Sequence, residues 1–199
     1  MRVSVSFWLL VIAAAIVSPI QVVVSVLLAA ALHECGHLAA LRMFHVPVEG
    51  LRLTALGAVL YAKGAQRLSY GRELLVTLAG PAANLLCALL AALLARGTQQ
   101  GTFYVFAGAN VVLCAYNLLP IPPLDGGRAL YLVTAFVFGP MVGDAAAAVV
   151  GTACALSLLV LGIYLSVVSG SGMFFLLAAF SLLLGTLPQL RLAKNAVKV

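Results

Sequence analysis

Charged residues are scarce in this 199-residue sequence. Lysine, arginine, aspartate and glutamate make up 8% of it, whereas soluble domains carry roughly 25%. Hydrophobic residues make up 64%, and the mean hydropathy is +1.18. So little polar surface cannot cover a water-soluble globule. Because backbone exposed to lipid must satisfy its own hydrogen bonds, the composition predicts an all-α polytopic membrane protein.

Other absences narrow the class further. The four cysteines all lie in apolar runs without a CxxC pair, which excludes a disulfide framework and favours small buried side chains. The basic residues behind the net charge of +6 do not lie on one amphipathic face, so they do not indicate a nucleic-acid-binding surface. We find no internal repeat, no low-complexity tract and no soluble second domain, and we expect a single domain over residues 1–199.

Long apolar runs divide the chain into about six transmembrane helices, since a span needs about 20 apolar residues. We predict spans at about 4–17, 21–43, 73–95, 102–119 with a broken continuation through 125–138, 144–168 and 172–190. The first run could instead be a cleaved signal peptide, but the next run follows it so closely that a hairpin of two spans fits better.

The positions of the basic residues predict the orientation. Five of them fall between residues 42 and 72, and three more follow residue 190. Basic residues favour the cytoplasmic side. With six crossings, the N- and C-termini are then both cytoplasmic.

The segment from Val46 to Lys63 differs from an ordinary linker. Its apolar residues partly alternate, and Gly50 and Gly57 interrupt them. This pattern predicts a short β-hairpin after the second span, lying against the membrane. Such backbone is tolerated at membrane depth only where protein buries it or where it lines a wet cavity.

Two of the three histidines lie in one short motif within a hydrophobic helix, His33-Glu34-Cys35-Gly36-His37. Residues four apart share a helix face, so His33 and His37 can hold one zinc ion. Glu34 can act as the general base on a water molecule. The alternative is a chance pentapeptide, but burying these groups in a membrane without a task is costly.

A catalytic zinc ion takes three protein ligands, and Asp125 is the best candidate for the third. It follows three prolines that end the preceding helix, and Gly126 and Gly127 come directly after it. Taken alone, Asp125 could equally be a helix N-cap. If the second and fourth spans both run toward the cytoplasm, Asp125 and the two histidines lie at similar depth.

Two polar residues in apolar runs carry two interpretations each. Asn117 could bind the substrate backbone or an oxyanion, or satisfy a carbonyl near the helix break. Asn84 could contribute to the site, or lie in a helix-packing segment. The third histidine, His45, we read as interfacial.

These motifs resemble the site-2 protease family of intramembrane metalloproteases. HECGH matches its HExxH, NLLPIPPLDGG is similar to its NxxPxPxLDGG, and AGPAAN, residues 79–84, is similar to its AGPxxN. The short form and the hairpin look most like the sporulation-type subgroup, the stage IV sporulation protein FB-like proteins, which process a membrane-associated pro-sigma factor. Several members carry a C-terminal nucleotide-sensing CBS domain, and we expect none within residues 1–199.

The resemblance implies a catalytic core at about 5–138, followed by C-terminal helices at about 144–190. It implies one Zn²⁺ held by His33, His37 and Asp125, with Glu34 as catalytic base. The expected activity is hydrolysis of membrane-associated or single-span protein substrates in regulated intramembrane proteolysis, in the bacterial cytoplasmic membrane. Beyond the lipid bilayer and the substrate, an inhibitory or regulatory membrane partner is possible, and nucleic acid is not expected.

Three residues are candidates for substrate binding: Asn117, Asn84 and Gly57, the last because the 46–62 hairpin could pair with an extended substrate. The alternative function is a catalytically inactive membrane metal-binding or scaffold protein. Glu34 counts against it, because metal binding alone does not need a carboxylate beside the ligands.

Overall fold

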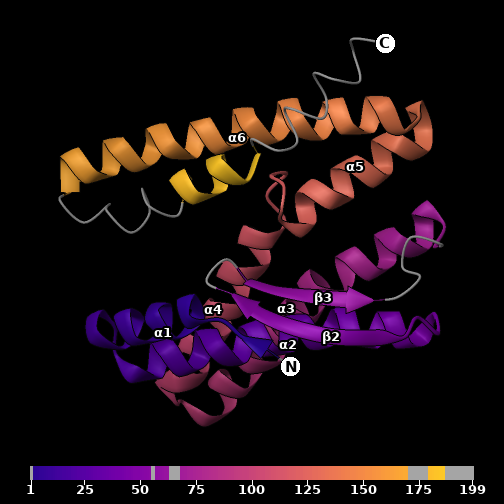
Figure 1. Ribbon diagram of the computed structural model, residues 1–199. Coiled ribbons are helices and arrows are strands. Elements are labelled where there is room, and N and C mark those ends of the chain that lie inside the picture. The colour runs from indigo at the N-terminus through magenta and orange to yellow at the C-terminus, as the bar shows by residue number, and fades with distance from the viewer. Residues whose placement is uncertain (1, 55–56, 63–67, 170–178, 187–199) are drawn as a thin grey trace. The chain divides into compact units, whose positions relative to one another are not determined.

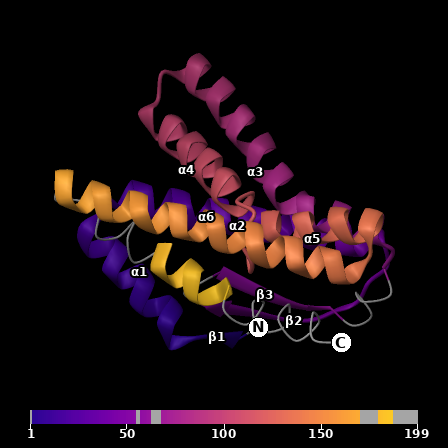
Figure 2. The same ribbon diagram turned by 90° about the horizontal axis from the view of Figure 1, so that it is seen from above.

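The computed structural model describes residues 2–54, 57–62, 68–169 and 179–186. It divides into two compact units, Met1–Tyr116 and Asn117–Val199, which are described separately below. Figure 1 shows the helices and strands with most of their labels, and strand β1 is labelled in Figure 2.

Four helices make up most of the first unit: α1 (Val5–Val17), α2 (Ile20–Met43), α3 (Tyr70–Thr98) and α4 (Gly101–Asn117), whose last residue begins the second unit. Pro19 separates α1 from α2 and holds Ser18 extended, because proline disfavours the helical conformation in the residue before it. Gln99 ends α3 in the left-handed conformation, and α4 begins two residues later. Figure 2 shows the chain turning back from α3 into α4, and the side chains of Asn84 on α3 and Asn110 on α4 are hydrogen-bonded.

One strand before the first two helices and two strands after them form a three-stranded sheet. Its order is β1 (Arg2–Val3), β2 (Val48–Thr54), β3 (Gly57–Ala62), with β1 parallel to β2 and β2 antiparallel to β3. The antiparallel pair lies in the segment where the sequence predicts a hairpin. The association of this pair with the membrane remains a prediction.

Helix α2 ends in a specific turn. His45 adopts a left-handed conformation with φ 55, the N–H of His45 bonds to Arg42 O, and the N–H of Val46 bonds to Leu41 O. Leu41 and Val46 are both buried. These bonds and this apolar pair form a Schellman motif, which caps the last carbonyls of the helix and directs the chain toward β2.

The second unit contains a helical hairpin of α5 (Asp125–Phe138) and α6 (Pro140–Ser169), visible in both views (Figures 1 and 2). The two helices approach closely at Gly143, where an added Cβ would lie 2.8 Å from Cβ of Ala135 and 3.0 Å from the backbone oxygen of Tyr131. Residues 179–186 are also helical.

Among the described residues, three helices are long and apolar enough to cross a membrane: Ile20–Met43, Tyr70–Thr98 and Pro140–Val168. They correspond to the predicted spans at 21–43, 73–95 and 144–168. The shorter α1, α4 and α5 lie where the sequence predicts the remaining spans before residue 138, and part of the predicted 172–190 span lies outside the described residues. The count of six spans therefore stays a prediction.

The burial pattern of α3 is the reverse of a soluble helix. Its buried residues are small or polar: Thr77, Gly80, Pro81, Asn84, Ala88, Ala91 and Ala95. Its leucines face outward, for example Leu85 at 61% and Leu89 at 59% exposure. Small residues let helices approach closely in lipid, where apolar side chains are stable on the outside. This pattern supports a membrane location for α3.

Candidate metal centre

The HECGH motif lies on α2 and turns both imidazoles inward. His33 and His37 are 5% and 9% exposed, and their ring centroids lie 4.7 Å apart in an edge-to-face arrangement. Glu34 is half-buried. Cys35 is exposed, so the prediction of a buried cysteine is wrong at this position; Cys87 and Cys154 are half-buried, and Cys114 is buried. The four-residue spacing thus brings the two rings together as the sequence predicts.

His37 is anchored by main chain. Its Nδ1 lies 2.8 Å from the backbone oxygen of Val76, on α3. A carbonyl oxygen can only accept, so Nδ1 carries the proton and the Nε2 of a neutral His37 ring carries a lone pair.

His33 is anchored by a side chain, Asn84 of α3. Nδ1 of His33 lies 2.7 Å from Oδ1 of Asn84, while Nδ2 of Asn84 donates to the backbone oxygen of Ala29 at 2.9 Å. The Ala29 carbonyl fixes the orientation of the amide, because it requires a donor. Oδ1 of Asn84 is therefore the acceptor, Nδ1 of His33 carries the proton, and the Nε2 of His33 presents a lone pair.

The two Nε2 atoms lie 3.1 Å apart. When both rings are neutral and carry their protons on Nδ1, two lone pairs face each other, and either a shared proton or a metal cation between them would remove the repulsion. Two nitrogen ligands, each about 2.0–2.1 Å from one tetrahedral zinc ion, are about 3.3 Å apart. Hydrogen bonds from the second ring nitrogen to a carbonyl or a side-chain oxygen are also the usual support of metal-bound histidines. The histidine pair therefore fits a zinc ion.

Gly80 of α3 provides the space that the rings occupy. A Cβ at this position would overlap Nε2 and Cε1 of His37 and Cε1 of His33. In the opposite direction, a Cβ at Gly36 would overlap the backbone oxygen of Ala79 and the Cβ of Ala83. Each helix therefore has a glycine where the other helix is closest, and this close contact places the two imidazoles against α3.

Asp125 is the first residue of α5, and it is half-buried. The preceding turn folds back over the start of the helix, so that a Cβ at Gly126 would overlap the backbone oxygens of Leu118 and Leu119. A Cβ at Gly127 would lie 2.5 Å from the backbone carbon of Ile121. The two glycines are thus required by close backbone approach, as the sequence predicts for this turn.

Within the described part of the chain, the group of three side chains that could hold one metal ion is His33, His37 and Asp125. Two imidazoles and one carboxylate are a donor set that suits zinc.

The other predicted residues have different positions. Asn84 lies in the histidine network, with its side chain fully buried. Asn117 ends α4, and Gly57 begins β3 opposite Thr54. The proposed roles of Asn117 and Gly57 in substrate binding remain predictions.

Sequence reasoning missed two residues around the histidines, Val76 and Asn110, and it identified Gly80 only as part of a helix-packing segment. Asn110 of α4 is fully buried and accepts a hydrogen bond from Nδ2 of Asn84 at 2.9 Å. A polar residue inside an apolar run was already the criterion that singled out Asn84 and Asn117, and it applies equally to Asn110. The roles of Val76 and Gly80 depend on where α2 crosses α3, which no local pattern reveals.

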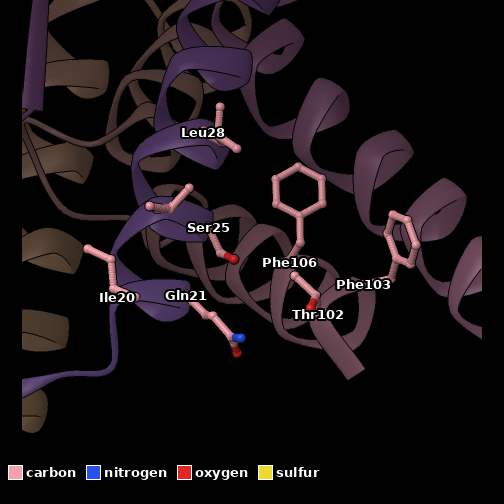
Figure 3. A pocket seen from close by; sticks show the side chains of 8 residues that line it. Ile20, Gln21, Ser25, Leu28, Thr102, Phe103 and Phe106 are labelled. Atoms are coloured by element: carbon pink, nitrogen blue, oxygen red, sulfur yellow. The ribbon is translucent and has the colours of Figure 1, made fainter. Parts of the chain in front are cut away.

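A separate cavity of about 400 Å³ lies between α2 and α4 (Figure 3). It is lined by Ile20, Gln21, Val24, Ser25, Leu28, Thr102, Phe103 and Phe106. This lining is mostly apolar and holds no histidine, cysteine or carboxylate. The cavity therefore offers no such ligand for a metal ion, in contrast to the histidine pair.

Comparison with known proteins decides the family. The sequence profile of peptidase family M50 matches residues 21–102 and 93–161, which together cover most of the chain. The chain belongs to peptidase family M50. This family membership confirms the resemblance to site-2 proteases. The first matched segment contains the histidine motif, and the second contains Asp125.

Two curated relatives of this M50 chain match over about two thirds of its length. Stage IV sporulation protein FB of Bacillus subtilis is 28% identical over 128 residues, covering 63% of this chain and 44% of the relative. A zinc metalloprotease of Methanocaldococcus jannaschii is 26% identical over 137 residues, covering 66% of this chain and 40% of the relative. The matched region thus spans less than half the length of either relative.

The fold also matches a solved structure. The site-2 protease from Methanocaldococcus jannaschii aligns with a TM-score of 0.72 at 22% identity, over 94% of this chain and 88% of that one. At this identity the match shows a shared fold. The M50 chain therefore has a site-2 protease fold.

Proposed function

We propose that this protein is an intramembrane zinc metalloprotease that hydrolyses peptide bonds of membrane-associated or single-span protein substrates. The observation that carries the proposal is the histidine pair, whose Nε2 atoms lie 3.1 Å apart. On each ring Nδ1 faces an oxygen acceptor, which requires the tautomer that leaves Nε2 able to bind a metal. Membership of peptidase family M50 supports hydrolysis as the use of such a pair.

His33, His37 and Asp125 are the proposed ligands of one zinc ion per chain. The two imidazoles are held by α3, and Asp125 stands at the first position of α5, after the proline-rich turn. When bound, zinc would polarise the scissile carbonyl and lower the pKa of the attacking water. A three-ligand set leaves room for that water.

Glu34 is the proposed general base. It directly follows His33 on α2, and it is half-buried. Its carboxylate accepts the proton of the attacking water and then delivers it to the nitrogen of the leaving amine. Metal binding needs no such group, which makes Glu34 the residue that separates a protease from a metal-binding scaffold.

We propose that the substrate binds in extended form, because a helical peptide bond is shielded by its own hydrogen bonds. The β2–β3 pair is the candidate edge for an added substrate strand, with Gly57 at the start of β3. Asn117 is the candidate for holding a substrate carbonyl. We place the protein in the bacterial cytoplasmic membrane with both termini in the cytoplasm, where an inhibitory or regulatory membrane protein could also bind.

The test compares the wild-type chain with Glu34→Gln in liposomes that contain a panel of single-span membrane proteins. Fragments are identified by mass spectrometry with and without a chelator, and bound metal is measured by elemental analysis. We expect wild type to release fragments that the chelator abolishes. Glu34→Gln should lose cleavage by at least 10³-fold, on the scale of the loss of a catalytic base, while retaining zinc.

Each contrary result has a clear meaning. Equal cleavage by Glu34→Gln would remove Glu34 from the mechanism. Zinc bound to both proteins without any fragments would favour a metal-binding scaffold, and absence of bound zinc from both would overturn the metal centre itself.

A further inference from the structure

A chain of amide hydrogen bonds extends from His33 across three helices. Nδ1 of His33 meets Oδ1 of Asn84, Nδ2 of Asn84 donates to Oδ1 of Asn110 at 2.9 Å, and Nδ2 of Asn110 donates to the backbone oxygen of Phe106 at 2.9 Å. Both asparagine side chains are 0% exposed. Burying two primary amides in an apolar bundle is costly unless their hydrogen bonds are made. Here the bonds are made, and the question is what two buried asparagines contribute that apolar residues would not.

Every link in this chain has one permitted direction. The Phe106 carbonyl accepts only, so Nδ2 of Asn110 faces it and Oδ1 of Asn110 faces Asn84. Asn84 must then present both hydrogens of Nδ2, one to Asn110 and one to Ala29. The remaining atom, Oδ1, faces His33.

The alternative orientation of Asn84 would inactivate His33 as a metal ligand. A flipped amide would present Nδ2 to the ring, which stabilises a lone pair on Nδ1 and a proton on Nε2. That flip also turns Oδ1 of Asn84 against two acceptors, the Ala29 carbonyl and Oδ1 of Asn110. Asn110 therefore supplies one of the two repulsive contacts that disfavour the wrong orientation.

We infer that Asn110 is a positioning residue for the metal centre: it fixes the amide of Asn84 and thereby holds His33 in the tautomer whose Nε2 can bind a metal. The inference rests on the proposed function. It adds α4 to the helices that build the centre, because the histidines lie on α2 and Asn84 lies on α3.

The experiment measures tautomer and metal affinity in the metal-free, full-length protein. The chain has three histidines, so ¹⁵N-histidine labelling gives a spectrum in which the protonated ring nitrogen of each can be identified. Zinc affinity is measured by competition with a chromophoric chelator. The variants are Asn110→Leu, which has similar size and no polar atom, and Asn110→Asp, which keeps an oxygen toward Asn84.

We expect wild-type His33 to carry its proton on Nδ1. Asn110→Leu should show a mixture of the two tautomers at His33 and bind zinc about 10-fold more weakly, at the lower end of the effects measured for groups that support metal ligands. Asn110→Asp should restore both readouts toward wild type. Cys114→Val, a buried position one turn further along α4, is the matched control and should change neither.

An unchanged tautomer and unchanged zinc affinity in Asn110→Leu would overturn the inference while leaving the proposed function intact. Failure of wild type itself to bind zinc would overturn the proposed function. If Asn110→Leu does not fold, Asn110→Ala removes the same acceptor without added bulk, and the same two outcomes apply. An equal loss in Cys114→Val would show that packing of α4, not the amide, is responsible.

Discussion

Nδ1 of His37 donates a hydrogen bond to the backbone oxygen of Val76 over 2.8 Å, so the second histidine of the motif is held by main chain. The first histidine is held by the side chain of Asn84. Substitution of residue 76 leaves the backbone acceptor of His37 in place, whereas substitution of residue 84 removes the side-chain acceptor of His33. The two ligands of the proposed centre therefore differ in their sensitivity to mutation.

Replacing Asn84 with leucine should weaken zinc binding by about 10–100-fold, because His33 loses the acceptor that fixes its ring. The effect should exceed that of Asn110→Leu, since Asn84 contacts the ring directly. Chelator competition measures the affinity. Thr77→Val, another buried polar position on α3, serves as control and should stay near wild type. Equal losses at both positions would indicate a general disturbance of α3.

Gly80→Ala should displace the imidazoles, since the added methyl group would overlap atoms of both rings. We expect loss of zinc affinity by at least 10-fold, together with loss of cleavage. Gly97→Ala is the matched control on the same helix, where nothing lies within 4 Å of an added Cβ. That control should be neutral or slightly more stable, because alanine favours helix. Retained zinc affinity in Gly80→Ala would contradict the proposed packing of the rings.

Zinc should raise the thermal stability of the purified protein, because a ligand that binds only the folded state stabilises it. At a free zinc concentration 100 times the Kd, the gain is about 2.7 kcal/mol. A scan of melting temperature with added zinc or chelator measures it. His33→Ala, His37→Ala and Asp125→Ala should each reduce the shift, while His45→Ala, at the third histidine, should retain it. A full shift in Asp125→Ala would exclude that residue as a ligand.

His45→Gly should stabilise the protein by about 0.5 kcal/mol. The left-handed conformation at φ 55 costs a non-glycine residue roughly 1 kcal/mol, and the greater freedom of glycine in the unfolded chain offsets part of the gain. Thermal unfolding in detergent measures the change. A β-branched residue such as valine at this position should destabilise the turn instead. Destabilisation by glycine would mean that the His45 side chain itself contributes more than its backbone strain costs.

Gly57→Pro should reduce substrate cleavage if substrates add a strand beside β3, because proline removes a backbone donor and stiffens the strand. The zinc-dependent thermal shift should persist, since Gly57 does not belong to the proposed ligand set. Fragment yield by mass spectrometry and the thermal shift are measured on the same preparation. Unchanged cleavage would count against strand addition.

The parts of the fold that the sequence predicts best are those set by membrane thickness. The runs at 21–43 and 73–95 differ from α2 and α3 by only a few residues at their ends, because a bilayer needs about 20 apolar residues and the charged flanks mark where they stop. The helix break between α4 and α5 is equally predictable from the sequence, because the prolines after Asn117 cannot continue a helix and α5 begins at Asp125.

The support around the histidines could not be predicted in the same way. HECGH places two rings on one helix face by spacing alone, but the acceptors for those rings come from α3, 39 positions away from His37 and 51 positions away from His33. Which residue of α3 meets which ring depends on how Gly36 and Gly80 let the helices approach. Strand β1 was missed for another reason, because two residues, Arg2 and Val3, carry no alternating pattern.

All the anchors of the two imidazoles, from Ala29 to Asn110, belong to the unit that ends at Tyr116. During synthesis, that portion leaves the ribosome before Asp125 does. On the proposed ligand set, a chain synthesised only as far as Tyr116 contains the two imidazoles without the carboxylate. The proposed metal centre is therefore completed only once the proline-rich turn and the first residue of α5 have been synthesised.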